Sequence, residues 1–188
     1  MTDAPPLDTP APDAPAPSVE AAAWPAQLYA TLKTAGVRHA SYVPDAGHAE
    51  LIRRFEEDPE AAAVMLSTEE EGIALACGAW LGGMRSAVLM QSSGVGNCIN
   101  MLSLPAQARM PLLMLVTMRG EWGEFNPWQV PMSRAVQPSL EAMGVSVVRV
   151  EEAGEVAPTV AQAAAMAFGG DRRIAVLLGQ RLLGAKKW

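Results

Sequence analysis

The alternation of short apolar runs with helix-length segments constrains the fold of this chain more than any other feature of its sequence. Six runs of strand length are rich in aliphatic residues, at 37–43, 61–66, 87–90, 111–117, 145–150 and 174–178. Segments with helical character separate them, at 24–35, 47–57, 69–84, 95–109 (bent or ended near Pro105), 138–143 and 155–168. This pattern predicts an α/β fold, a doubly wound, six-stranded, mainly parallel sheet with helices on both faces.

The first 18 residues differ from the rest in composition. Six of them are proline and three are aspartate, and none is a large aromatic residue. Such a segment cannot bury enough apolar surface to offset its ordering entropy, so we expect 1–18 to be a disordered tail and 19–188 to form one domain. The first basic residue is Lys33, which argues against a signal or transit peptide.

Charge and composition exclude several classes of protein. The 14 Lys and Arg against 20 Asp and Glu give a net charge of −6, so nucleic acid and anionic membranes are poor candidate partners. Two cysteines and two histidines argue against a disulfide scaffold and a Cys- or His-rich metal centre, and we expect no metal ligands in this chain. No apolar run approaches the roughly 20 residues of a membrane helix. The composition fits a reducing, soluble, cytoplasmic setting.

The unusual side chains gather in four segments that follow predicted strands, at 44–48, 67–70, 91–97 and 118–136. Ligands of parallel sheets bind at the carboxyl ends of the strands, so we expect a functional site there. We expect 118–136 to be a long loop. Its two tryptophans and one phenylalanine favour a pocket wall or an interface over a loop that only covers the sheet edge.

Three adjacent glutamates begin the helix expected at 69–84. Thr68 and Glu71 have the spacing of a capping box, and acidic residues suit the first turn of a helix, so helix initiation accounts for Glu71. Three neighbouring carboxylates also repel one another, which increases the proton affinity of the least solvated one, and proton-relay chemistry needs such a group. From the residues alone, a structural and a catalytic role both stay open.

The glycine-containing segment 91–97 reads Gln-Ser-Ser-Gly-Val-Gly-Asn and directly follows a predicted strand. Glycines there allow a ligand to approach the backbone closely. The segment lacks the Gly-Lys-Ser/Thr of a P-loop, and Ile99 stands where the dinucleotide fingerprint needs a small residue. It is therefore either a loop for an unknown ligand or a tight turn.

Asp45 and His48 lie just past the first predicted strand. A lone histidine is often structural, but this position also suits acid–base chemistry or anion binding. We expect His39 to be structural, and Cys77 and Cys98 to be small core residues.

Together these blocks resemble the pyrimidine-binding (PYR) domain of thiamine-diphosphate-dependent decarboxylases, over about residues 24–184. The resemblance rests on Val-Pro-Asp at 43–45, Thr-Glu-Glu-Glu-Gly at 68–72 with Ala-Cys-Gly at 76–78, the segment 91–97, and Arg-Gly-Glu at 119–121. It is greatest to the sulfopyruvate and phosphonopyruvate decarboxylase group, and within that group to its separate α subunit.

The resemblance implies that Glu69 activates thiamine diphosphate, because the family's glutamate precedes a helix glycine by nine residues, as Glu69 precedes Gly78. Glu69 would hydrogen-bond the pyrimidine nitrogen and favour the imino tautomer, which takes the proton of the thiazolium carbon. The cofactor would then attack a 2-oxo acid, carbon dioxide would leave, and an aldehyde would be released. The resemblance further implies contacts to the cofactor from Gln91, Ser92, Ser93, Gly94 and Asn97, and contacts to the substrate from Asp45, His48, Arg119 and Glu121.

The substrate implied by the resemblance is a small 2-oxo acid with an anionic sulfonate or phosphonate, which Arg119 would suit. The aromatic residues of 122–129 depart from the family's pattern and leave an aromatic or less charged acid open.

Complete enzymes of this class also carry a Gly-Asp-Gly motif and a downstream Asn that hold Mg²⁺. This sequence has no such motif, and its nearest approach is Gly-Gly-Asp-Arg at 169–172. The resemblance therefore implies half of a hetero-oligomer, in which a β subunit with the diphosphate-binding (PP) domain supplies the metal site. Two alternatives stay open, half of a carboligase or acyltransferase that uses the same cofactor, and a non-catalytic subunit that retains the fold.

Overall fold

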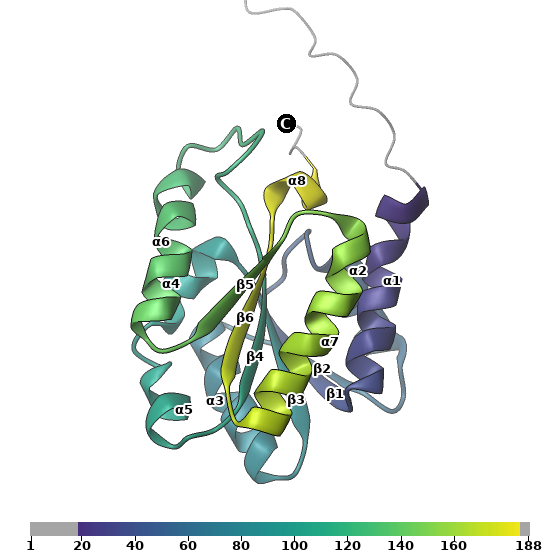
Figure 1. Cartoon of the computed structure of the whole chain (residues 1–188), viewed down its shortest axis with the longest axis vertical. Coiled ribbons are helices and arrows are strands. Elements are labelled where there is room, and N and C mark those ends of the chain that lie inside the picture. The colour runs from purple at the N-terminus through teal and green to yellow at the C-terminus, as the bar shows by residue number, and fades with distance from the viewer. Residues whose placement is uncertain (1–18, 185–188) are drawn as a thin grey trace, which may run out of the picture.

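The computed structural model describes residues 19–184 and contains one six-stranded sheet (Figure 1). The tail predicted at 1–18 lies outside the described residues. The strands follow the order β2-β1-β3-β4-β6-β5, and all neighbouring pairs are parallel. Their bounds are β1 Val37–Tyr42, β2 Ala62–Met65, β3 Arg85–Gln91, β4 Leu112–Thr117, β5 Ser146–Val150 and β6 Arg173–Leu178. The predicted sheet is thus confirmed, and it is parallel throughout.

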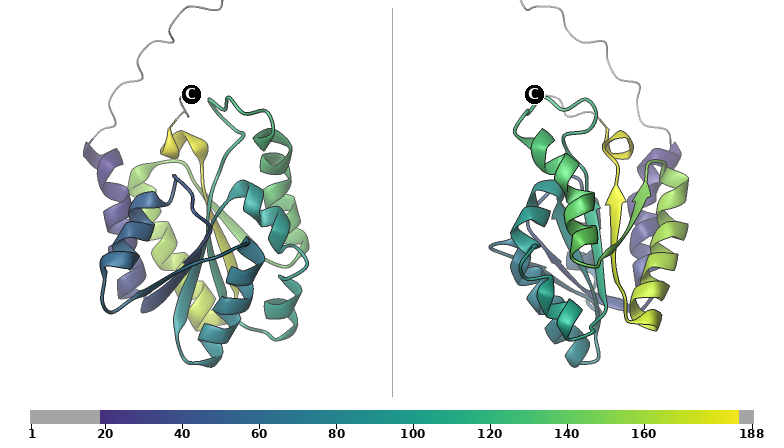
Figure 2. Two further views of the ribbon diagram at one scale, coloured as in Figure 1. Left: turned by 180° about the vertical axis from the view of Figure 1, so that it is seen from behind. Right: turned by 60° about the vertical axis from the view of Figure 1, so that its left-hand side comes forward.

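Helices cover both faces of this sheet, as the two views of Figure 2 show. One layer contains α1 (Val19–Thr34), α2 (Ala49–Glu57) and α7 (Ala153–Gly170). The other contains α3 (Glu69–Leu81), α4 (Val95–Cys98), α5 (Ser103–Gln107) and α6 (Gln129–Ala142). A short helix, α8 (Gln180–Leu183), follows the last strand.

Strand β4 shows why the chain folds into these layers. All six of its residues are buried, and successive side chains of a strand point to opposite faces. Leu113 and Leu115 belong to the core beneath α1, α2 and α7, whereas Met114 and Val116 belong to the core beneath α3 and α6. An unbroken apolar strand therefore requires a helix layer on each side.

Two predicted segments differ in the structure. The loop expected at 118–136 is shorter, because α6 begins at Gln129 rather than at 138. Its first turn contains Pro131, a place where a missing backbone N–H costs little, and the helix continues through Pro138. The helix expected at 95–109 is divided into α4 and α5, and α5 contains Pro105. A 3-10 turn, η1 (Ser92–Gly94), directly precedes α4.

The parallel arrangement places the carboxyl ends of all six strands at one edge of the sheet, the upper edge in Figure 1. The segments after β1, β3 and β4 meet there. Across the part of the chain that the structure describes, no helix is both long and apolar enough to cross a membrane.

Candidate active site

Glu69 is the first residue of α3, directly after the helix N-cap Thr68, and its side chain is buried with 9% exposed. One carboxylate oxygen, Oε2, accepts a hydrogen bond of 2.7 Å from Nδ2 of Asn97 on α4. The Asn97 amide makes no hydrogen bond to the other oxygen, Oε1, which lies beside Gly94. The site therefore contains a shielded carboxylate with one fixed oxygen and one oxygen available to a ligand.

Gly94 forms the other side of the space that holds this carboxylate. A Cβ atom at position 94 would lie 2.3 Å from Oε1 of Glu69 and 2.4 Å from its Cδ, far below a normal contact distance. The backbone of Gly94 has φ −69°, which any residue can adopt. Glycine is needed here for space and not for backbone conformation.

Of the capping box predicted from Thr68 and Glu71, only a hydrogen bond to Glu71 forms, and its donor is a different backbone N–H. The Thr68 side chain makes no capping hydrogen bond. The Glu71 carboxylate instead accepts the backbone N–H of Ser67 at 2.9 Å, one residue before the N-cap. Glu71 thus serves helix initiation, which leaves Glu69 as the buried carboxylate of the three.

A second polar cluster surrounds Asp45, after β1. Its carboxylate accepts hydrogen bonds from Oγ1 of Thr117 at 2.5 Å and from Nε2 of Gln91 at 3.4 Å, and Oε1 of Gln91 accepts one from Ser93 at 2.9 Å. Burial by itself raises the pKa of Asp45, but the hydrogen bonds from Thr117, the backbone of Gly47 and Gln91 hold it below its usual value. Asp45 is therefore a carboxylate at neutral pH.

The segment 91–97 joins the two clusters. Gln91 at one end contacts Asp45, and Asn97 at the other end contacts Glu69. Ser92 between them is buried, and its Oγ accepts the backbone N–H of Arg119 at 3.1 Å. Of the five predicted cofactor residues, Gly94 and Asn97 thus contact Glu69, whereas Gln91, Ser92 and Ser93 make their contacts on the side of Asp45 and Arg119.

His48 lies inside the protein, with 1% of its surface exposed. Its Nε2 is 3.0 Å from the carbonyl oxygen of Leu115, so this nitrogen donates, and Nδ1 has no partner in the described structure. Burial lowers the pKa of His48, which is therefore neutral at pH 7. A contact between His48 and a substrate stays a prediction.

Arg119 and Glu124 form a two-pronged ion pair in the loop after β4. Nε and Nη2 of Arg119 donate to the Glu124 carboxylate at 2.5 and 2.6 Å, and the two side chains are 12% and 3% exposed. The Arg119 guanidinium lowers the pKa of Glu124 to about 2. The predicted anion-binding arginine thus has a partner within its own loop, and Nη1 is the part of the guanidinium that this pair leaves out.

Gln180, the first residue of α8, hydrogen-bonds the same loop and holds it near the end of β6. Its buried side chain accepts the backbone N–H groups of Glu121 and Trp122 at 2.8 and 3.0 Å and donates to Glu124 at 3.0 Å. The Glu121 carboxylate forms an ion pair with Arg149 at the end of β5. These contacts make the loop a fixed wall of the site.

The sequence analysis did not assign Glu124 or Gln180 to the candidate site. Their position in the sequence was the signal that could have indicated them, because both follow a strand at the carboxyl edge of the sheet.

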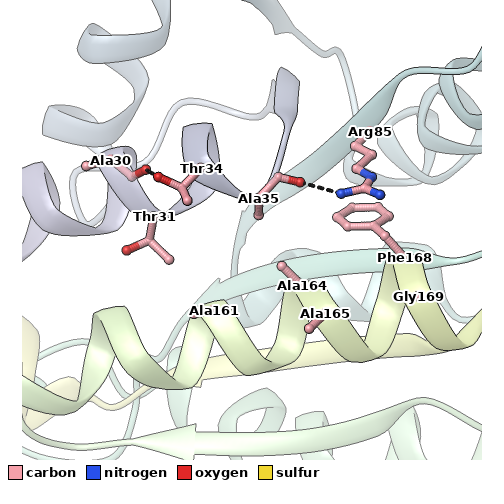
Figure 3. Close-up of a pocket in the computed structure, with 10 residues that line it drawn as sticks. All are labelled: Ala30, Thr31, Thr34, Ala35, Arg85, Ala161, Ala164, Ala165, Phe168 and Gly169. Carbon is pink, nitrogen blue, oxygen red and sulfur yellow. Dashed lines mark hydrogen bonds between the residues drawn. The ribbon is translucent and has the colours of Figure 1, made fainter.

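A separate hollow of about 590 Å³ lies between α1 and α7 (Figure 3). Five alanines and Gly169 line most of it, and the Arg85 guanidinium lies 5.4 Å from the centre of the Phe168 ring and donates to the carbonyl of Ala35. Arg85 begins β3, whereas Gln91 ends it. This hollow is therefore at the opposite edge of the sheet and does not belong to the site around Glu69.

The fold and this site define the class of protein. The profile of the thiamine pyrophosphate enzyme N-terminal TPP binding domain matches residues 25–130, which include both polar clusters. The chain therefore belongs to the thiamine pyrophosphate enzymes.

Relatives with curated names indicate its place in that class more narrowly. Sulfopyruvate decarboxylase subunit alpha of Methanothermobacter thermautotrophicus is 34% identical over 152 residues, which cover 80% of this chain and 92% of that protein. Phosphonopyruvate decarboxylase of Streptomyces viridochromogenes is 40% identical over 100 residues, which cover 53% of this chain but 25% of the longer protein.

Solved structures support the fold. A 2-oxoglutarate:ferredoxin oxidoreductase from Magnetococcus marinus has a TM-score of 0.66 at 15% identity, over 85% of this chain and 29% of that one. A protein from Mycobacterium smegmatis described as a thiamin diphosphate-dependent enzyme has a TM-score of 0.65 at 19% identity, over 87% of this chain and 31% of that one.

Proposed function

We propose that this chain is the α subunit of a two-subunit, thiamine-diphosphate-dependent 2-oxo-acid decarboxylase. The substrate would be sulfopyruvate, phosphonopyruvate or a similar acid, and the products an aldehyde and carbon dioxide. The observation that carries the proposal is the buried Glu69 carboxylate at the carboxyl edge of the sheet, held by Asn97 and enclosed by Gly94. The names of the relatives support the choice of reaction.

The residues around Glu69 fit the pyrimidine part of the cofactor. Oε1 of Glu69 offers a hydrogen-bonding group to a ring nitrogen, and Gly94, without a side chain, leaves the room in which the Glu69 carboxylate lies. Gln91, Ser93 and Asn97 supply further amide and hydroxyl groups at the same edge. We assign the cofactor contacts to Gln91, Ser92, Ser93, Gly94 and Asn97.

Bound thiamine diphosphate would supply the carbanion chemistry that cleaves the bond to the carboxylate. The task of Glu69 is to exchange a proton with the pyrimidine nitrogen at its Oε1 atom, and its burial keeps bulk water from competing for that hydrogen bond. Asp45 and the loop wall of Arg119, Glu121 and Glu124 would face the substrate. An anion there would meet the Nη1 group of Arg119.

We assign Mg²⁺ and the cofactor's diphosphate to a β subunit with a PP domain, because the relatives named subunit alpha imply a second chain. Exposed apolar side chains support an interface. Leu75 and Leu81 of α3 are 38% and 75% exposed, and Trp128 before α6 is 85% exposed. Large apolar side chains exposed in this way are typical of protein contacts. We propose a hetero-oligomer in the cytoplasm.

The test is a Glu69→Gln variant assembled with the β subunit, with product analysis after incubation with sulfopyruvate and phosphonopyruvate. Glutamine keeps the shape of the side chain but cannot take up the proton. We expect aldehyde formation to fall at least 100-fold, about 2.7 kcal/mol of transition-state stabilisation. Unchanged aldehyde formation by the variant would contradict the proposal. A carbon–carbon or acyl-phosphate product would indicate a carboligase or acyltransferase instead.

A further inference from the structure

We propose that Asn97 is a positioning residue, which acts on the cofactor through Glu69 rather than by contact of its own. Its side-chain amide would fix the plane of the Glu69 carboxylate and so select which oxygen faces the pyrimidine ring. This inference rests on the proposed function, and it changes the role of Asn97 within it from cofactor contact to support of the catalytic carboxylate.

The hydrogen bond between the two side chains joins separate helices. Glu69 begins α3 and Asn97 lies on α4, which packs beside α3. Nδ2 of Asn97 donates to Oε2 of Glu69 at 2.7 Å, within the usual range for an N–H···O hydrogen bond. The bond thus occupies one of the two oxygens of a carboxylate that is 91% shielded from water.

Packing holds one side of this carboxylate. The slot beside Gly94 bounds the Oε1, Cδ and Cγ atoms of Glu69, since a Cβ at position 94 would lie 2.3–2.5 Å from them. The last torsion of a glutamate, however, is broad and twofold, so contact on the Oε1 side does not by itself set the carboxylate plane. A directional donor such as the Asn97 amide is what restricts that torsion.

A positioning role and a cofactor contact predict different kinetics. If Asn97 only orients Glu69, Asn97→Ala lowers kcat at least tenfold and leaves the KM of the substrate and the Kd of thiamine diphosphate within twofold. Asn97→Asp has the same shape but places a second carboxylate against Glu69, so it lowers kcat further. Asn97→Ser keeps a short donor and restores part of the loss.

The kinetic experiment uses the enzyme assembled with the β subunit. Calorimetric titration with thiamine diphosphate and Mg²⁺ gives the cofactor Kd, and steady-state assays at saturating cofactor give kcat and KM. A cofactor Kd that rises tenfold or more with unchanged kcat would make Asn97 a cofactor contact and overturn the inference. Full activity of Asn97→Ala, with no change in Kd, would also overturn it.

A second experiment measures the pair in the full chain by itself. The midpoints of thermal unfolding are compared for wild type, Glu69→Ala, Asn97→Ala and the double variant. We expect the shifts to be non-additive by about 2–4 °C, because each single variant already breaks the same hydrogen bond. Additive shifts would overturn the inference.

The outcomes of these two experiments can be distinguished from a failure of the proposed function. If Glu69→Gln keeps full decarboxylase activity, the proposed function fails, and the unfolding cycle still decides whether Asn97 holds Glu69. If Asn97→Ala does not fold, Asn97→Asp replaces it in both experiments.

Discussion

At the scale of single residues, the site depends on small groups that leave room for a carboxylate. Glu69 reaches its buried position because residue 94 has no side chain and because Asn97 offers a donor. Neither neighbour is charged. The carboxylate is thus shielded without an ion pair that would compete with a ligand for it.

We predict that Gly94→Ala inactivates the assembled enzyme while the chain still folds. The new Cβ would lie 2.3 Å from Oε1 of Glu69, so the carboxylate must leave its slot, whereas the helical backbone at position 94 accepts alanine. We expect kcat to fall at least tenfold, measured alongside circular dichroism. Gly169→Ala is the matched control, because no atom lies within 4 Å of its Cβ, and it should keep full activity. An active Gly94→Ala enzyme would show that the carboxylate has room to move.

The Arg119–Glu124 pair gives a pH-dependent contribution to stability. The pKa of Glu124 falls from 4.5 to about 2 in the folded chain, so the unfolded chain binds the proton first as the solution is acidified. The contribution is complete above about pH 4.5 and is lost progressively as the pH falls towards 2.

Urea unfolding of wild type and Glu124→Gln tests this pair. At pH 7 the variant leaves the guanidinium of Arg119, 12% exposed, without its partner, and we expect a loss of about 2–4 kcal/mol in the free energy of unfolding. The difference should narrow between about pH 4.5 and 3. A difference independent of pH over this range would show that the ionisation of Glu124 does not contribute.

Residue types at strand ends indicated much of this site from the sequence alone. Asp45, Glu69 and the segment 91–97 all lie at one edge, as the positions of their strands predicted. The partners of Arg119 did not follow from sequence, because an arginine beside two glutamates can pair with either or bind a ligand. Which one it chooses depends on tertiary contacts such as those of Gln180.

At the scale of secondary-structure elements, the position of α6 was the main difference from expectation. Proline is a signal for the start of a helix, and the sequence contains it at both 131 and 138. The earlier start is favoured by burial, since Ser133 and Val136 face the sheet. The local sequence pattern therefore predicted that a helix is present, whereas packing determines the residue at which it begins.

Of the side chains from other elements that hold the loop 118–128, between β4 and α6, Gln180 makes the most hydrogen bonds to it, beside those of Ser92 and Arg149. We predict that Gln180→Ala loosens it, because two backbone N–H groups and the Glu124 carboxylate lose their partner at once. The expected loss is about 1–3 kcal/mol of unfolding free energy. Hydrogen exchange should become faster at the amides of Glu121 and Trp122, while the amides of β4 stay protected. Unchanged exchange at both amides would contradict the assignment.

Helix α3 is apolar on its outer side as well as on its buried side. Leu81 at its end is 75% exposed, whereas Glu69 at its start is buried. A β subunit that completes the cofactor site beside Glu69 can extend along this helix. The outer side of α3 is thus the surface that we expect the second chain to cover.

We predict that Leu81→Glu weakens binding to the β subunit at least tenfold and changes the stability of the isolated chain by less than about 0.5 kcal/mol. Analytical ultracentrifugation of the mixed subunits gives the affinity. Met166→Glu on α7 is the matched control, because Met166 is also exposed, at 39%, but lies in the other helix layer. Equal effects of both variants would argue against a specific interface on α3.

At the scale of the whole molecule, the chain holds in place the side chains that it contributes to the proposed site. Glu69, Asp45 and the fixed loop are held by contacts within the chain. Within residues 19–184, no group of three or more His, Cys, Asp or Glu side chains could hold a metal ion. A diphosphate with its Mg²⁺ needs oxygen ligands and a dry cavity. The proposed β subunit would supply both where it meets α3.

The last prediction concerns the proposed sharing of the cofactor site between the two subunits. The purified chain with thiamine diphosphate and Mg²⁺ alone should release no carbon dioxide from sulfopyruvate or phosphonopyruvate, and addition of the β subunit should start the reaction. Activity should rise in proportion to the complex formed and reach a plateau when one subunit is saturated, because each site needs both chains. Carbon dioxide release by the single chain, at a rate unaffected by the β subunit, would mean that this chain holds the entire cofactor itself. Glu69→Gln in the same mixture is the control, because loss of carbon dioxide release shows that the reaction takes place at the site that contains Glu69.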